Sequence, residues 1–299
     1  PRTGGIALLA GLTCGGLLAA PLLADRSAWA WIVGAVVLVA GVSALDDRGE
    51  VRPLYRLLAH VAAAAALVLA GLTWSPLELP GRAVVPAAPV AVGITLLYVV
   101  WMINLYNFMD GMDGFAGGMA VFGFTSLAML GWQAEDVSFA LVSAVVAAAA
   151  GGFLLGNFPP ARIFLGDLGS ATLGLLAAAL SLIGTRRGLF PLWIAWIAFS
   201  PFIVDATWTL GRRLLRRERI WQAHRSHYYQ RLVLAGWSHR KTVVRAYALM
   251  AACAASAVAA PRLTVDEQWL LLAAWAVVYL LIAYRTRLAE RGSRGGTPS

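Results

Sequence analysis

The chain has 299 residues, of which 60% are hydrophobic and only 13% are charged, and its mean hydropathy is +0.72. A soluble domain carries about 25% charged residues, so this composition excludes an ordinary soluble protein and indicates one that spans a membrane. The net charge of +9 does not indicate nucleic-acid binding, because the basic residues lie between apolar segments, where they set membrane orientation.

Apolar stretches long enough to cross a bilayer recur along the chain and predict ten membrane-spanning helices. We therefore expect an all-α, polytopic membrane protein with one domain over residues 1–299. It would carry a long cytoplasmic loop at 211–242 and a cytoplasmic tail at 285–299, which we expect to be disordered. The predicted spans are 4–23, 28–45, 57–74, 87–104, 116–132, 137–156, 168–184, 189–210, 243–260 and 266–284.

The connections between these spans alternate between two sides, and basic residues favour one side by 18 to 5. The positive-inside rule makes the richer side cytoplasmic, although Arg186 and Arg187 on the other side violate the rule locally. Five aspartates lie at cytoplasmic span ends and come from three separate connections, which predicts an active site on that face. These aspartates are Asp46, Asp47, Asp110, Asp113 and Asp167.

The first acidic motif, Asp46-Asp47, directly follows an apolar run. Two adjacent carboxylates at a membrane boundary repel each other, and burying them costs several kcal/mol unless a cation compensates. Magnesium can supply that cation, because it takes one or two carboxylates and leaves positions for water and phosphate oxygens. Taken alone, the pair is more typical of a solvated helix cap.

The second motif places amides and carboxylates at strict three-residue spacing, as Asn104, Asn107, Asp110 and Asp113. On a continuous helix the two asparagines share one face with glycines, and the two aspartates share the neighbouring face. The small residues would allow close helix packing, while the polar groups would project into the protein rather than into lipid. A Gly-rich packing helix with an Asp cap is the alternative, but the segment is too polar for packing alone.

The third motif runs from Asn157 through two prolines to Asp167, where the next predicted span begins. The prolines favour an extended entry, and Gly166 and Gly169 flank the aspartate. Asp167 fits a helix cap that uses the N-terminal dipole, and it fits equally well a metal ligand beside backbone that a phosphate can approach. Beside the other two motifs, the metal ligand is favoured.

The fourth motif, His224, Arg225 and His227, lies in the long loop. Arginine and histidine donors fit a diphosphate, and a structural loop cluster is the alternative. Asp205, inside a predicted span, is interpreted as the structural partner of a nearby arginine. A buried role in the site is the less favoured alternative for this residue.

In this order, the four motifs resemble the polyprenyl-phosphate N-acetylhexosamine-1-phosphate transferase family, glycosyltransferase family 4, over essentially the whole chain. The resemblance implies a bundle of ten or eleven membrane helices in the bacterial inner membrane, with a cytoplasmic active site. It also implies Mg²⁺ as cofactor, with Mn²⁺ as a substitute. The first helix of the family would precede Pro1, so we expect eleven spans in the full protein.

The resemblance also assigns roles to residues. Asp46, Asp47 and Asp110 would be catalytic, and Asn107 and Asp167 would bind the metal together with Asp47. The substrate-binding set would comprise Arg56 for phosphate, Asp113 and Phe164 for uracil, and Asn104, Asn157, His224, Arg225 and His227. The fourth motif lacks the triple histidine of the lipid I enzymes and looks more like transferases that initiate O-antigen or capsule chains.

The implied reaction is a phosphoryl transfer from a UDP-sugar to undecaprenyl phosphate, with UMP as the leaving group. The partners would be these two substrates and the surrounding membrane lipids, without nucleic acid, and a homodimer is compatible with the sequence. Two alternatives are an intramembrane prenyltransferase and a transporter. The first would need two similar Asp-rich helical motifs, and the second would need polar groups near span midpoints and internal repeats.

Overall fold

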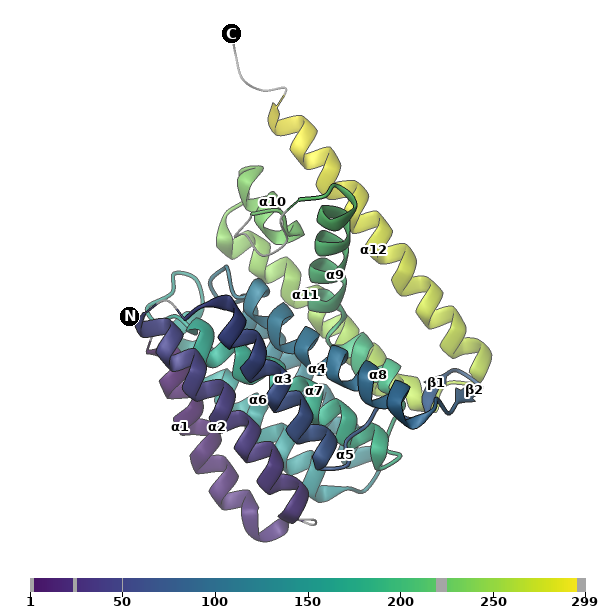
Figure 1. Ribbon diagram of the computed structural model, residues 1–299. Helices are drawn as coiled ribbons and strands as arrows, with labels where there is room; N and C mark the ends of the chain where they lie inside the picture. The colour runs from purple at the N-terminus through teal and green to yellow at the C-terminus, as the bar shows by residue number, and fades with distance from the viewer. Residues whose placement is uncertain (1–2, 24–25, 50, 219–224, 295–299) are drawn as a thin grey trace.

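The computed structural model describes residues 3–23, 26–49, 51–218 and 225–294, which form a helical bundle with one short strand pair (Figure 1). The antiparallel strands pair Leu77 with Val84 and Leu79 with Arg82. The elements are α1 (Gly4–Ala19), η1 (Ala20–Leu22), α2 (Arg26–Arg48), α3 (Pro53–Leu69), β1 (Leu77–Leu79), β2 (Arg82–Val84), α4 (Ala88–Met109), α5 (Phe115–Gln133), α6 (Val137–Asn157), α7 (Gly166–Arg186), α8 (Leu192–Ala198), α9 (Ser200–Leu215), α10 (Tyr228–Leu234), α11 (His239–Ala259), η2 (Ala260–Arg262) and α12 (Val265–Arg294).

Helix α7 is the centre of the bundle and packs against α1, α2, α4, α5, α6 and α8. All its residues from Leu168 to Thr185 are buried. Small residues allow its neighbours to come close: a Cβ at Gly174 would lie 2.5 Å from the carbonyl oxygen of Met102 in α4. The apolar sequence of α7 is thus surrounded by protein on all sides, and its first residues are held at a fixed position among the other helices.

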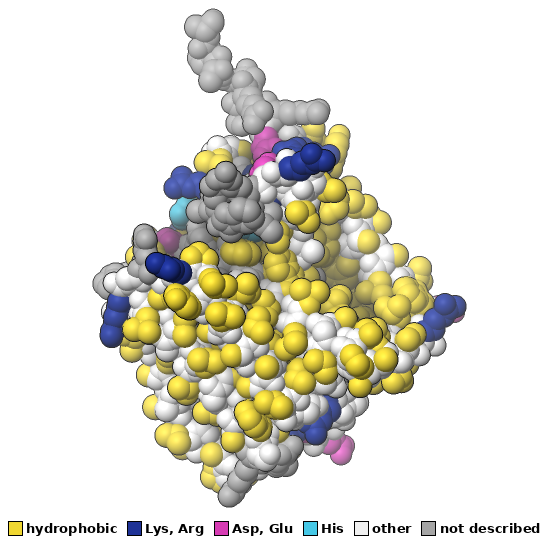
Figure 2. All heavy atoms as spheres, viewed as in Figure 1, with side chains coloured by type: hydrophobic (Ala, Val, Ile, Leu, Met, Phe, Trp, Pro, Cys, Tyr) yellow, Lys and Arg dark blue, Asp and Glu magenta, His cyan; other side chains and the backbone are white. Residues whose placement is uncertain are grey.

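Among the described residues, eight helices are long and apolar enough to cross a membrane, or nine if α8 and α9 count as one broken span. Helix α3 is a shorter apolar helix. Hydrophobic side chains cover most of the face in Figure 2, with Lys and Arg at its edges. The prediction of an all-α polytopic membrane protein is confirmed.

The continuous span predicted at 189–210 is wrong, because α8 and α9 meet at an angle of 87°. Helix α8 ends at Ala198, and Pro201 stands in the first turn of α9. Proline lacks a backbone N–H and its ring clashes with the carbonyl four residues earlier, so the helix cannot continue through this point. Helix α9 therefore changes direction after α8, and it packs against α4 and α11.

The predicted disordered tail is also wrong for residues 285–294, because α12 continues to Arg294. Arginine, leucine, alanine and glutamate in this stretch favour a helix, and the Glu290 carboxylate pairs with Arg231 of α10. Residues 295–299 lie outside the described residues.

The two arginines that violate the positive-inside rule have local partners near the C-terminal end of α7. Arg187 pairs with Asp136 at 2.8 Å, in the connection between α5 and α6. Arg186 donates at 2.8 Å to the carbonyl of Ala70, just past the end of α3, where a cation is favoured by the helix dipole. Both charges therefore tie helix ends together.

Candidate active site

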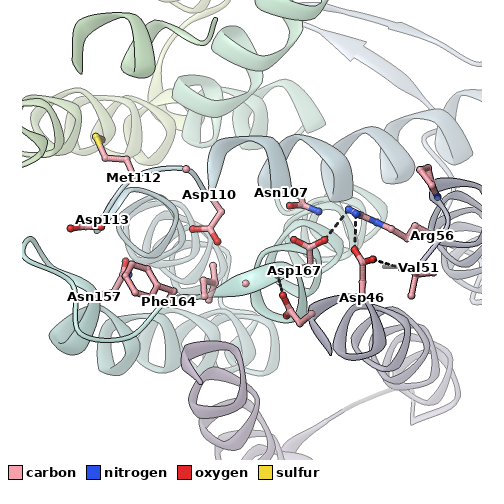
Figure 3. A pocket seen from close by; sticks show the side chains of 15 residues that line it. Asp46, Val51, Arg56, Asn107, Asp110, Met112, Asp113, Asn157, Phe164 and Asp167 are labelled. Atoms are coloured by element: carbon pink, nitrogen blue, oxygen red, sulfur yellow. Dashed lines mark hydrogen bonds and ion pairs between the residues drawn. The ribbon is translucent and has the colours of Figure 1, made fainter. Parts of the chain in front are cut away.

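A cavity of about 750 Å³ lies at the end of the bundle opposite Arg186 and Arg187, where three connections meet. These are the α2–α3, α4–α5 and α6–α7 connections, which also carry the first three sequence motifs (Figure 3). The lining residues are Asp46, Asp47, Val51, Pro53, Arg56, Asn107, Asp110, Gly111, Met112, Asp113, Asn157, Phe164, Leu165, Gly166 and Asp167. All five aspartates singled out in the sequence therefore face one cavity.

Arg56 of α3 bridges two of these carboxylates. Its Nη1 lies 2.7 Å from Asp46 Oδ2, and its Nη2 lies 3.0 Å from Asp167 Oδ2. The planar guanidinium suits this role, because its donors form a fixed fork. The other oxygen of Asp46 accepts from the backbone N–H of Val51 at 2.9 Å, which orients the carboxylate. Two acidic side chains from different connections thus converge on one positive charge.

Asp47 lies against the first turn of α7. Its carboxylate oxygens accept from the backbone N–H groups of Asp167 and Leu168 at 3.3 and 3.1 Å. A carboxylate in this position satisfies helix N–H groups and complements the dipole. Gly166 adopts a φ of +69°, and a Cβ there would lie 2.8 Å from Asp47 Oδ2, so both backbone and space require glycine. The chain from α2 thereby fixes the start of α7.

Asp110 follows α4 and points into the middle of the cavity, while Asn107 lies beside Asp167 (Figure 3). Desolvation raises the pKa of Asp110 to about 7, and the negative charges of Asp167 and Asp47 act in the same direction. A hydrogen bond from the backbone of Gly166 opposes this shift. The carboxyl of Asp110 can therefore hold a proton near neutral pH, and the cavity has an excess of negative charge.

The other end of the cavity is built from Asp113, Asn157 and Phe164 (Figure 3). Asp113 Oδ2 accepts from the backbone N–H of Ala161 at 3.2 Å, and Phe164 is 46% exposed. Asn157 is buried; its oxygen accepts from the N–H of Gly114 and its nitrogen donates to the carbonyl of Ile163, each at 2.8 Å. Asn157 thus ties the α4–α5 and α6–α7 connections together.

Asn104 does not line the cavity, although it lies one turn before Asn107 on α4. Its side-chain nitrogen donates to the carbonyl of Val100 at 2.7 Å and lies 3.3 Å from His60 Nδ1. Helix α4 ends at Met109, so the continuous helix expected through this motif is absent and only the two asparagines lie on α4. A three-residue step advances by 300°, which leaves them about 60° apart around the axis. Asn104 consequently faces α3.

The fourth motif is divided in the structure. His224 lies outside the described residues, Arg225 is exposed, and His227 is buried. His227 Nδ1 lies 3.2 Å from Asp205 Oδ1, and His227 does not line the cavity. Asp205 was interpreted as the partner of a nearby arginine; among the described residues its direct contact with an ionisable side chain is with His227, and its charge also acts on Arg231.

Tyr229 was not predicted as a functional residue, yet its hydroxyl lies next to Gly111, which lines the cavity. A Cβ on Gly111 would lie 2.2 Å from the Tyr229 hydroxyl oxygen. Tyr229 is 4% exposed, which is low for a tyrosine two residues after a loop histidine. The local pattern Tyr-Tyr-Gln offered no indication of which ring turns inward.

The donors around Arg56 fit a hard divalent cation. Asp46, Asp167 and Asn107 offer oxygen ligands, and two of them already share a positive charge. In the described part of the chain, no three His, Cys, Asp or Glu side chains form a group that could hold a metal by themselves. Magnesium sites commonly take one or two carboxylates and complete their coordination with water and substrate phosphates, so the donor set fits such a site.

The fold and the cavity define a multi-pass membrane protein with an acidic site at one end of its helical bundle. Residues 29–185 match the model of glycosyl transferase family 4, and the chain belongs to that family. This confirms the resemblance drawn from the motifs. The matched region contains the first three motifs and excludes the His224–His227 stretch.

Curated relatives extend the similarity over most of the chain. A probable undecaprenyl-phosphate N-acetylglucosaminyl 1-phosphate transferase of Bacillus subtilis is 32% identical over 294 residues, covering 97% of this chain and 80% of the relative. A decaprenyl-phosphate N-acetylglucosaminephosphotransferase of Mycobacterium tuberculosis is 31% identical, covering 83% and 69%. A phospho-N-acetylmuramoyl-pentapeptide-transferase of Pelotomaculum thermopropionicum is 32% identical, covering 87% and 83%.

Proposed function

We propose that the protein transfers an N-acetylhexosamine 1-phosphate from a UDP-sugar to undecaprenyl phosphate, which yields undecaprenyl-diphosphate-sugar and UMP. The observation that carries this proposal is the meeting of five aspartates and Arg56 in one cavity at one end of an apolar bundle. The names of the relatives support the reaction, and they make UDP-N-acetylglucosamine the first donor to test. The product would initiate a cell-envelope glycan such as O-antigen or capsule.

The reaction requires two anionic phosphate groups to approach each other. An oxygen of the lipid phosphate attacks the β-phosphorus of the UDP-sugar, and the bond from that phosphorus to the bridging oxygen breaks as UMP leaves. A bound Mg²⁺, held by Asp167 and Asn107 with Asp46 or Asp47, would neutralise phosphate charge and favour in-line attack. Manganese would be expected to substitute for it.

The protein side chains have distinct parts in this scheme. Arg56 would exchange its contacts with Asp46 and Asp167 for contacts with phosphate oxygens, for which its fork is equally suited. Asp110, with its pKa near 7, could accept the proton of a singly ionised lipid phosphate. Because the second pKa of a phosphate monoester is about 6, most of the acceptor is already doubly ionised at neutral pH.

The nucleotide would occupy the end of the cavity lined by Asp113 and Phe164. The exposed aromatic ring can stack on a base, and a carboxylate can accept from the N–H of uracil. The polyprenyl chain would stay in the bilayer beside the apolar helices. This division accounts for a polar cavity at the end of a bundle rather than at its middle.

The central experiment measures UMP release by the purified protein with undecaprenyl phosphate, Mg²⁺ and a panel of UDP-sugars. Asp167→Asn keeps the side-chain shape and removes its charge, and we expect about a hundredfold loss or more. The matched control Asp136→Asn removes a carboxylate at the far end and should keep the rate within about twofold. Equal rates for the two variants, or no UMP release with any sugar, would refute the proposal.

We also propose that the protein lies in a bacterial inner membrane and that its cavity opens on the cytoplasmic side. In a background without Cys14 and Cys253, single cysteines at the exposed positions Arg48 and Arg240 should react with an impermeant maleimide only in inside-out vesicles. A cysteine at Arg82, in β2, should react only from the opposite side. Labelling of Arg48→Cys and Arg240→Cys from different sides would exclude a common cytoplasmic site.

A further inference from the structure

Asp205 is a buried carboxylate of α9 that lies outside the active-site cavity. Its Oδ1 accepts from Thr209 Oγ1 at 3.1 Å, from the backbone N–H of Tyr228 at 3.0 Å, and from His227 Nδ1 at 3.2 Å. An ionised carboxylate is only an acceptor, so His227 Nδ1 carries the proton in this contact. Two of the three donors belong to the first residues of α10 and its cap, so Asp205 attaches that helix to α9.

His227 occupies the cap of α10, where its backbone N–H donates to Gln230 Oε1 at 3.2 Å. Its ring stacks on the ring of Tyr229, with centroids 6.0 Å apart and planes inclined by 13°. Both side chains are buried. By accepting from the imidazole, Asp205 therefore holds the cap residue of α10, whose first turn carries Tyr229 into the protein.

Tyr229 in turn supports the connection that carries two of the cavity aspartates. Its hydroxyl donates to the carbonyl of Phe108 at 3.4 Å, and its ring packs on Phe115 with centroids 4.7 Å apart. These two residues flank the segment from Met109 to Gly114. The tyrosine hydroxyl also fills the space next to Gly111, where no side chain could fit. Tyr229 thus packs against the connection on both sides of Asp110 and Asp113 and next to Gly111 between them.

A second anchor holds the other part of α10. Arg231 makes a bidentate ion pair with Glu290 of α12, at 2.5 and 2.6 Å. This contact holds the middle of α10, whereas the first turn of the helix is held by Asp205. The first turn of α10 determines where Tyr229 lies. It also determines the position of the chain just before the cap, where the exposed Arg225 lies two residues before His227.

We propose that Asp205 is a positioning residue for the transfer reaction, acting through His227 to fix the first turn of α10 against the α4–α5 connection. The inference rests on the proposed function and goes beyond it, because neither residue of the pair lines the cavity. Loss of the contact would release the support behind Asp110 and Asp113. It would also release the segment at Arg225, whose guanidinium is expected to face the diphosphate and sugar.

The proposal predicts a selective effect on ligands. UMP lacks the β-phosphate and the sugar, so its binding depends less on the segment at Arg225 than the binding of the UDP-sugar does. A variant without the Asp205–His227 contact should therefore raise KM for the UDP-sugar more than it raises the inhibition constant of UMP. A variant that merely lowers the folded fraction would reduce kcat and leave both constants unchanged.

The test compares His227→Phe, which keeps a ring but removes the donor, with His227→Asn, whose side-chain N–H can donate near the position of Nδ1. We expect His227→Phe to raise the ratio of KM to the UMP inhibition constant by about tenfold, since small misplacements near a reacting group are costly. His227→Asn should stay within about threefold of the unsubstituted protein. Asp136→Asn, at the far end, is the control for general loss of stability.

Backbone hydrogen exchange supplies a readout that does not depend on the reaction. His227→Phe should accelerate exchange at residues 228–231 and also at 110–114, whereas His227→Asn should not. If exchange at 110–114 is unchanged in His227→Phe, or if both variants alter it equally, the positioning role is excluded. If exchange changes as expected while the unsubstituted protein releases no UMP, the proposed function fails and the structural coupling stands.

Discussion

Replacing Arg56 by alanine tests the arrangement at the centre of the cavity. The guanidinium stands between Asp46 and Asp167, at 2.7 and 3.0 Å. Its loss leaves two carboxylates from different connections facing each other without the positive charge that joins them. We therefore expect Arg56→Ala to unfold more easily in EDTA, and we expect Mg²⁺ to offset the loss by neutralising the same carboxylates.

The magnitude follows from the exposure of the three side chains, which is 31% for Arg56, 12% for Asp46 and 27% for Asp167. An exposed ion pair contributes about 0.2–1 kcal/mol, whereas breaking a buried pair costs about 3–5 kcal/mol. These two partly exposed contacts fall between those limits, so their joint loss should cost about 2 kcal/mol. For a chain of 299 residues that corresponds to a Tm lower by about 3 °C.

The assay is thermal unfolding in EDTA and in excess Mg²⁺. Arg187→Ala is the matched control, because it breaks a pair with Asp136 of similar exposure, 25% and 19%, at the far end of the bundle. Mg²⁺ should raise the Tm of Arg56→Ala more than that of the unsubstituted protein, and it should not rescue Arg187→Ala. Equal rescue of both variants, or of neither, would refute a cation site at Asp46 and Asp167.

Three further predictions concern single residues of the cavity. Gly166→Ala should cost about 1–3 kcal/mol and lower Tm more than Gly188→Ala does, because both glycines have a φ of +69° but only the first has Asp47 in the way; equal shifts would contradict the packing argument. Phe164→Ala should raise KM for the UDP-sugar about tenfold and Phe164→Tyr should restore it, as stacking on a base contributes about 1–3 kcal/mol; an unchanged KM would remove the ring from the nucleotide site. The folded-state pKa of Asp110, about 7, lies above its ordinary value of 3.8, so ionisation destabilises the fold as pH rises between these values. In EDTA, the Tm advantage of Asp110→Asn should therefore grow from pH 5 to pH 8, and a shrinking advantage would contradict the raised pKa.

The sequence was sufficient to place the carboxylates together. Hydropathy located the span ends, and the alternation of connections put Asp46, Asp110 and Asp167 on one side, which the cavity bears out. This inference works because a helix that spans a bilayer can expose polar residues to water only at its two ends. The chemistry of the residue types then restricted what a cluster of such groups can bind.

The sequence could not show which partner each polar group takes. Asp47 accepts from the start of α7, and Asn157 ties two connections together, although the motifs and the family resemblance suggested contacts with metal and substrate. These choices depend on how α7 sits among its neighbours. One continuous span over 189–210 was predicted across Pro201, whereas α8 and α9 meet at 87°, an angle that depends on packing. That angle leads α9 and its Asp205 towards His227.

The most direct test of the proposed reaction follows the β-phosphate itself. A UDP-sugar labelled separately in the β-phosphate and in the sugar is incubated with the purified protein, undecaprenyl phosphate and Mg²⁺, and the lipid phase is extracted. We expect both labels to enter the lipid in equal amounts, matched by the UMP released, and neither to enter with Asp167→Asn. Transfer of the sugar without its β-phosphate, or retention of both labels in water, would contradict sugar-phosphate transfer.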